Sequence, residues 1–198
     1  MSGLGQQMIA LARQSLQDPR AGVRSVLALG VPLPARTIGL LLMAVASALL
    51  THLGFLLLPV DEDPTVGFMM QSPVRTAIVQ WLVLAASVFL IYRIGKAWGG
   101  KGSLPDTLLV VVWLQVIMLG VQFVQLLVFL LLPPLAGIVT LVGLVLFFWL
   151  MTSFIAELHG FKSRGAVLAG ILVASFGVAM VLVLILTLIL GPGAFGNV

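Results

Sequence analysis

Apolar residues fall in long continuous blocks along the chain, and short polar segments separate these blocks. Five of the blocks are each long enough to cross the hydrocarbon core of a bilayer, which takes roughly 20 residues of helix. A membrane barrel is built instead from strands of about ten residues with alternating polarity, and these blocks do not alternate. The pattern predicts an all-α membrane protein with five transmembrane helices at about residues 37–59, 75–94, 105–132, 135–159 and 165–190.

The polar segments carry an uneven charge. The segment between the first two spans contains the acids Asp61, Glu62 and Asp63. The predicted spans place nine basic residues on one side of the membrane, namely Arg13, Arg20, Arg24, Arg36, Arg93, Lys96, Lys101, Lys162 and Arg164. On the opposite side there is only Arg75. Because Lys and Arg collect in cytoplasmic segments, we predict a cytoplasmic N-terminus and, with five spans, an external C-terminus.

The residues before the first span form a segment with its own pattern. Apolar residues repeat every four positions from Leu4 to Leu16, while Gln and Arg take the other face. This pattern predicts an amphipathic helix that lies on the cytoplasmic leaflet or packs across the cytoplasmic ends of the bundle. A second short helix is expected at about 20–29. The predicted organisation is an amphipathic cytoplasmic segment at 1–35, a membrane domain at 36–190 and a short tail at 191–198.

Three connecting segments suggest particular conformations. Pro133-Pro134 leaves only a short turn between the third and fourth spans, so these two should form an antiparallel hairpin. The glycine-rich residues 95–103 are expected to be a flexible turn whose Lys96 and Lys101 face lipid phosphates. Glu157 and His159, near Lys162 and Arg164, are expected to form an ion-pair cluster at the interface.

The composition agrees with a membrane protein. The chain is 61% hydrophobic and 8% charged, and its mean hydropathy is +1.24, whereas soluble domains are about 25% charged. The first 25 residues lack the apolar core of a signal peptide, so we expect the chain to begin at or near Met1. The pI of about 10.4 indicates contact with anionic lipid rather than nucleic acid. The candidate contacts with lipid headgroups are Arg13, Arg20, Arg24, Arg36, Lys96, Lys101, Lys162 and Arg164.

Glutamines interrupt the third span. Gln115, Gln122 and Gln125 lie within about 100° of one another on a helix, so they share one face. An amide that faces lipid leaves its donors and acceptors unpaired, so this face should point into the bundle or toward a partner. Gln80 in the second span is a candidate partner, and His52 in the first span is a further candidate for this polar face. The face could fix helix register, line a polar ligand path or form an oligomer contact.

Small residues recur along one side of the fifth span. Ala166, Gly170, Ala174 and Gly177 form a predicted groove, because small residues let helix backbones approach closely in lipid. The pattern leaves open whether this groove receives a helix of the same chain or of another chain.

The chain carries little chemistry of the kind that enzymes use. It has no cysteine, two histidines and six carboxylates, and it lacks a Ser-His-Asp set, an HExxH motif and a cluster of metal ligands. Residues 95–103 resemble a phosphate-binding loop, but Gly102 stands where Ser or Thr must follow the Lys. Every acid lies in a loop or at a membrane edge, which argues against a proton-coupled pump. We therefore expect no catalysis, cofactor, metal or nucleotide.

Three stretches resemble the Yip1-domain membrane proteins in their small bacterial form. They are QDPRAGVRSVLAL before the first span, GKAWGGKGSLPDTLL before the third, and ELHGFKSRGAVLAGIL before the fifth. The resemblance implies a five-helix membrane domain with a cytoplasmic N-terminus. Eukaryotic members of that family are tied to vesicle trafficking and bind small GTPases and one another.

The leading expectation is a non-enzymatic integral membrane protein of the bacterial cytoplasmic membrane. It would associate with lipids and with other membrane proteins or itself, in an accessory, assembly or membrane-organising role. The alternative is a small transporter, channel or lipid-moving protein in which the glutamine face lines a polar path.

Overall fold

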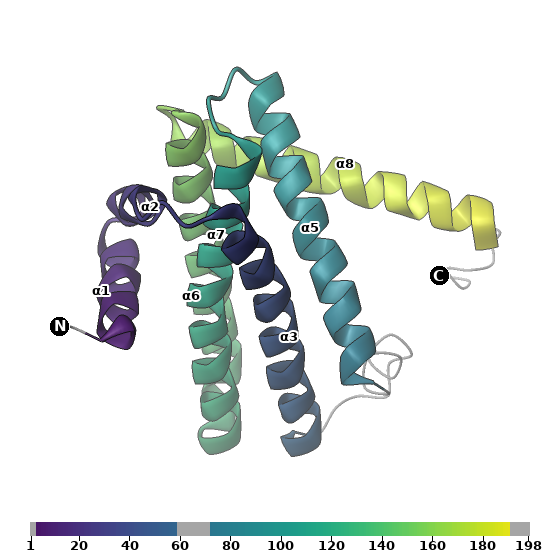
Figure 1. Cartoon of the computed structure of the whole chain (residues 1–198). Helices are drawn as coiled ribbons and strands as arrows, with labels where there is room; N and C mark the ends of the chain where they lie inside the picture. Colours follow the sequence, from purple (N-terminus) through teal and green to yellow (C-terminus); the bar gives the residue numbers. More distant parts are fainter. Residues whose placement is uncertain (1–2, 59–71, 191–198) are drawn as a thin grey trace.

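The computed structural model describes residues 3–58 and 72–190, and regular structure within these ranges is entirely helical (Figure 1). The acids at 61–63 and the tail at 191–198 lie outside the described residues. The elements are α1 (Leu4–Gln17), α2 (Pro19–Ala28), α3 (Leu33–Leu57), α5 (Pro73–Ala97), α6 (Leu104–Leu131), the 3-10 turn η1 (Pro133–Leu135), α7 (Ala136–His159) and α8 (Arg164–Leu190).

Three of the long helices have a proline in the first turn, and two of these, α5 and α6, also have a serine cap. Pro34, Pro73 and Pro105 lie in the first turns of α3, α5 and α6, where the missing N–H costs nothing. The Ser103 hydroxyl accepts a hydrogen bond from the Asp106 amide at 3.2 Å, and Gly160 ends α7 in the left-handed conformation at φ 73°, which favours glycine. The helix bounds are therefore within a few residues of those predicted.

Four segments are long and apolar enough to cross a membrane, namely Leu33–Leu57, Pro73–Ala97, Leu104–Leu131 and Pro133–His159. In Figure 1, α3, α5, α6 and α7 run side by side, and α8 crosses this bundle beside α5 and α7 and then projects beyond it. Of α8, the part Arg164–Met180 is a shorter apolar helix. The fifth span and the orientation in the membrane stay predictions.

Helices that follow one another along the chain pack against each other in the bundle of α3, α5, α6 and α7. α3 packs against α5 and α6, and α6 packs against α7. The turn η1 joins α6 to α7, which confirms the antiparallel hairpin predicted from Pro133-Pro134. The glycine-rich loop at 98–103 joins α5 to α6, and we call the end of the bundle at this loop the glycine-loop end. The opposite end, at η1, is called the hairpin end.

The main core lies toward the glycine-loop end and includes α2. Val23 and Val26 of α2 are fully buried against Leu109 and Trp113 of α6 and Phe154 of α7. α2 therefore belongs to the packed bundle, although the sequence grouped it with the segment at 1–35. In contrast, the described side chains of the first two turns of α1 are exposed.

Candidate functional site

A polar pocket lies within the bundle between α3, α5 and α6. Its volume is about 270 Å³, close to the lower limit of about 300 Å³ for ligand sites. Its polar lining comes from Ser47, Gln80, Gln115 and Gln122. The structure thus brings Gln80 together with two of the three glutamines of α6, as predicted. The Gln80 Oε1 atom is buried and has no hydrogen-bond partner among the described residues.

Gln122 joins two helices beside this pocket. Its Nε2 atom donates a hydrogen bond to the Thr51 hydroxyl on α3 at 3.0 Å. The Thr51 hydroxyl in turn donates to the Ser47 carbonyl at 2.9 Å. The amide thus holds α6 in register with α3, which is one of the three roles that the sequence left open for the glutamines.

Gln125 points into the bundle, but toward α7 and not into the polar pocket that Gln115 and Gln122 line. Its Nε2 atom donates to the Val139 carbonyl on α7 at 3.4 Å, and its amide occupies the space beside Gly143 that a Cβ atom would fill. The offset of about 60° from Gln122 around the helix is enough to turn the side chain from the α3 side of α6 to the α7 side.

His52 lies on α3 but does not line the polar pocket. Its ring meets Phe55 edge-on, with ring centroids 5.7 Å apart. His52 follows Thr51, the hydrogen-bond partner of Gln122. It nevertheless lies outside the group formed by Gln80, Gln115 and Gln122.

His159 is closely packed at the glycine-loop end. Its ring fills the space where Cβ atoms of Gly95 and Gly100 would stand, and it also approaches Gly102. The Lys101 amide donates to the His159 carbonyl at 3.1 Å. The Phe161 ring stacks on the imidazole, with ring centroids 5.5 Å apart. The predicted flexible turn at 95–103 is instead a glycine cradle around a side chain that is 2% exposed.

This burial also corrects the predicted ion-pair cluster. His159 faces the glycine cradle, while Glu157 pairs with Arg24 of α2 at 3.5 Å. The sequence could not assign His159 because the cradle comes from a loop more than fifty residues earlier. The available signal was the glycine spacing at 95, 100 and 102, which indicated close packing as readily as flexibility.

Two of the predicted headgroup contacts bind the protein itself. Arg36 donates to the carbonyls of Val31 at 2.7 Å and Pro105 at 2.6 Å, and it pairs with Asp106 at 3.0 Å. Arg20 donates to the carbonyls of Phe161 and Lys162. A guanidinium group has five N–H donors, so each of these arginines can bind more than one backbone carbonyl and join separate segments of the chain. The six other predicted contacts are exposed, namely Arg13, Arg24, Lys96, Lys101, Lys162 and Arg164, and of these Arg24 pairs with Glu157.

Only two of the four residues in the predicted small-residue groove on α8 are covered by the rest of the protein. Gly170 is buried under the Trp98 ring of the glycine loop, and Ala174 lines a groove against α5 and α7. Ala166 and Gly177 are exposed. The inward stripe of α8 therefore runs through Val167, Gly170, Ile171, Ala174 and Val178.

The described residues contain no group of three or more His, Cys, Asp or Glu side chains that could hold a metal ion. The polar groups of the pocket are amides and hydroxyls, which donate and accept hydrogen bonds but do not titrate near neutral pH. The arrangement can bind a polar group or fix helix register.

The four long apolar helices define an integral membrane protein built from a helical bundle. The family model of the Yip1 domain matches residues 13–189, and the chain therefore belongs to the Yip1 family. Comparison with curated proteins gives no match, and comparison with solved structures gives none either.

Proposed function

We propose that this Yip1-family protein is a non-enzymatic accessory protein that associates with another membrane protein or with a second copy of itself. The observation that carries the proposal is the path of α8, which packs against α7 and then projects beyond the bundle. A long helix that extends past its own bundle offers a surface for a helix of another chain.

The side chains of α8 agree with this role. Leu172, Val173, Phe176 and Met180 are between 53% and 70% exposed on the side away from the bundle. A helix that is apolar on all sides is stable only inside lipid or protein. Close packing with a second helix would cover these side chains and add the van der Waals contacts that drive association in lipid.

The glutamines contribute less to this proposal than the sequence suggested. Gln122 and Gln125 form hydrogen bonds within the bundle, so their amides are already used to hold α6 against α3 and α7. The association surface is therefore assigned to α8 rather than to the glutamine face.

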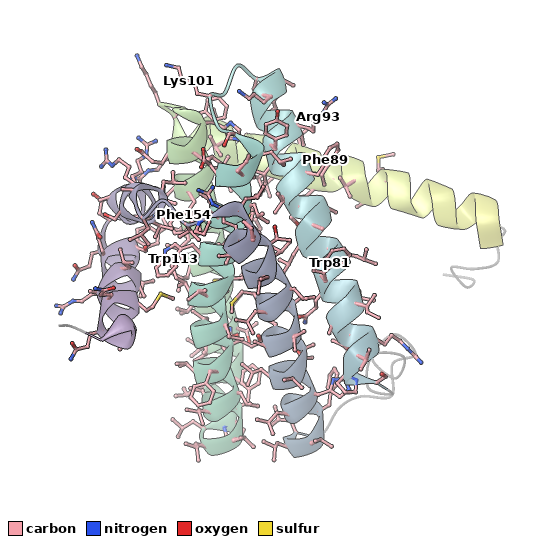
Figure 2. All side chains as sticks on the ribbon, viewed as in Figure 1. Trp81, Phe89, Arg93, Lys101, Trp113 and Phe154 are labelled. Atoms are coloured by element: carbon pink, nitrogen blue, oxygen red, sulfur yellow. The ribbon has the colours of Figure 1, made fainter. Side chains whose placement is uncertain are left out.

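A cytoplasmic glycine-loop end in a bacterial inner membrane completes the proposal. Figure 2 shows Lys101 and Arg93 at this end, and Arg24 and Arg36 contact residues of α7 and α6 there. Lys and Arg collect in cytoplasmic segments, which supports a cytoplasmic location for this end.

Isolation of the tagged chain in patches of its native membrane, followed by mass spectrometry, tests this function. We expect a stoichiometric protein partner or a second copy of the chain. Replacing Phe176 by Ala should reduce recovery of the partner, whereas replacing Phe123 by Ala, a residue of α6 that is also at least half exposed, should not. A monomer that co-isolates with nothing would contradict the proposal.

The polar pocket favours a second candidate, a small transporter, channel or lipid-moving protein. The Gln80 Oε1 atom, which is buried and has no hydrogen-bond partner within residues 3–58 and 72–190, marks a place where a polar solute could bind. Replacing Gln80, Gln115 and Gln122 by Leu should then abolish flux in liposomes, while Gln125→Leu, on the α7 side, should leave it intact. Unchanged flux in the folded triple variant would exclude this candidate.

A further inference from the structure

A second cavity, separate from the polar pocket, lies where α8 crosses α5 and α7. Its volume is about 370 Å³, within the range of about 300–1,000 Å³ for ligand sites. The α5 side is formed by Leu90, Ile91, Ile94 and Trp98. We call this cavity the α5–α8 groove.

The lining of the groove is nearly all apolar. Val167, Ile171, Ala174 and Val178 of α8 form its second wall. Ser87 and Ser175 are the polar residues of the lining, and the Ser87 hydroxyl already donates to the Val83 carbonyl at 2.8 Å. The groove therefore suits a long hydrocarbon chain and offers few partners to a polar ligand.

Positive charge lies at one end of the groove. Arg164 begins α8 and falls within an arc of about 80° with Val167, Ile171, Ala174 and Val178, so it shares the face that lines the groove. Lys162 directly follows Phe161, which also lines it. The ion pairs among the described residues are Arg24–Glu157 and Arg36–Asp106, so Arg164 and Lys162 have no acidic partner there.

We propose that the α5–α8 groove binds one anionic phospholipid, with an acyl chain along its apolar walls and the phosphate at Arg164 and Lys162. The N-terminus of α8 lies at the same place and adds a favourable field for an anion. Trp98 is 54% exposed and lies against Gly170, and tryptophan is enriched at the headgroup level of membranes.

The distribution of charge favours a lipid over a protein segment. A lipid is apolar along its length and anionic at one end, as the groove requires. A helix of a partner would bring backbone and side chains around its whole circumference and would need an acid at one matching position. This inference goes beyond the association of α8 with a partner, because the groove lies on the inward face of α8 and the partner surface on its outward face.

Native mass spectrometry of the purified full chain tests the proposal. The probes are phosphatidylglycerol and phosphatidylcholine with identical acyl chains. The wild-type chain should retain one phosphatidylglycerol more strongly than phosphatidylcholine. Arg164→Gln should weaken phosphatidylglycerol binding about fivefold, the effect of one basic residue near an anionic membrane surface. Arg13→Gln, an exposed position on α1, should leave it unchanged.

A second pair of variants tests the acyl-chain site. Ala174→Phe should fill the groove and reduce binding of both lipids, whereas Gly177→Phe, where a Cβ meets nothing within 4 Å, should not. Brominated phosphatidylglycerol should quench fluorescence in the wild type more than in Trp98→Phe, and this readout decides the matter if Ala174→Phe does not fold. Equal retention of the two lipids by the wild type, or undiminished binding by folded Ala174→Phe, would overturn the proposal.

Discussion

The glycine-loop end and the hairpin end of the bundle are packed in different ways. At the glycine-loop end, Leu150, Phe154 and His159 are at most 2% exposed, and buried hydroxyls and glycines surround them. At the hairpin end, Leu131 and Ile138 are 74% and 61% exposed. Close backbone packing and hydrogen bonds from Arg20 and Arg36 hold the first end, whereas amide bonds from Gln122 and Gln125 hold the second.

The difference indicates where the fold is specified. Apolar side chains at the hairpin end can face lipid at no cost, so many sequences would satisfy that end. The glycine-loop end instead requires side chains of particular size, because protein interiors are close-packed and do not adapt to an added methyl group. α2, the α5–α6 loop and α8 all meet at this end.

The largest expected effect comes from Gly95→Ala. Its Cβ would overlap the His159 ring, so we expect a loss of about 3 kcal/mol in the free energy of unfolding. Gly137→Ala at the hairpin end, where a Cβ meets nothing within 4 Å, should cause no loss. Unfolding in mixed micelles, followed by circular dichroism, measures both. Equal effects would erase the distinction between the two ends, and adding His159→Ala should restore part of the stability of Gly95→Ala.

Arg36→Gln should have the next largest effect. It removes charge-assisted contacts to Val31, Pro105 and Asp106, which we expect to lower the free energy of unfolding by about 2 kcal/mol. Arg13→Gln is the matched control because Arg13 is exposed on α1. If the two variants unfold alike, Arg36 does not hold the start of α3 to α6.

Ser15→Ala should cost about 1 kcal/mol. The Trp113 Nε1 atom donates to the buried Ser15 hydroxyl at 2.9 Å, and this bond ties α1 to the core. Trp113→Phe removes the same bond from the other side, so the double variant should lose less than the sum of the two single variants. Strict additivity in the same unfolding assay would show that the bond contributes nothing.

Gln122→Leu should have the smallest effect, about 0.6 kcal/mol, the average for a hydrogen bond between helices in a membrane. It removes the bond to Thr51 that holds α6 to α3. Unfolding of this variant beside Gly95→Ala compares the two ends directly. A loss as large as that of Gly95→Ala would mean that amide bonds, rather than close packing, hold the bundle.

The sequence predicted the features that depend on local pattern. Apolar block length and prolines located α3, α5, α6 and α7, and Pro133-Pro134 located the hairpin. It could not place His159, because the glycines that enclose it lie far away in the chain. It could not foresee that α8 leaves the bundle, because a helix that is apolar on all sides carries no sign of which face is covered.

The arginines show the same limit. Arg20 and Arg36 lie at a predicted membrane edge, where a guanidinium can contact either a lipid phosphate or a loop carbonyl. Composition favours neither, and only the positions of the Phe161 and Pro105 carbonyls decide that these two side chains bind the protein. Arg164 is exposed and contacts no such carbonyl of the described residues, so it stays available to lipid.

Photo-crosslinking in native membranes tests most directly whether α8 binds a partner. A photoreactive phenylalanine analogue replaces Phe176 on α8 in one variant and Phe123 on α6 in another, since both side chains are at least half exposed. We expect a discrete protein adduct at Phe176 and lipid adducts alone at Phe123. Lipid adducts alone at both positions would contradict this expectation.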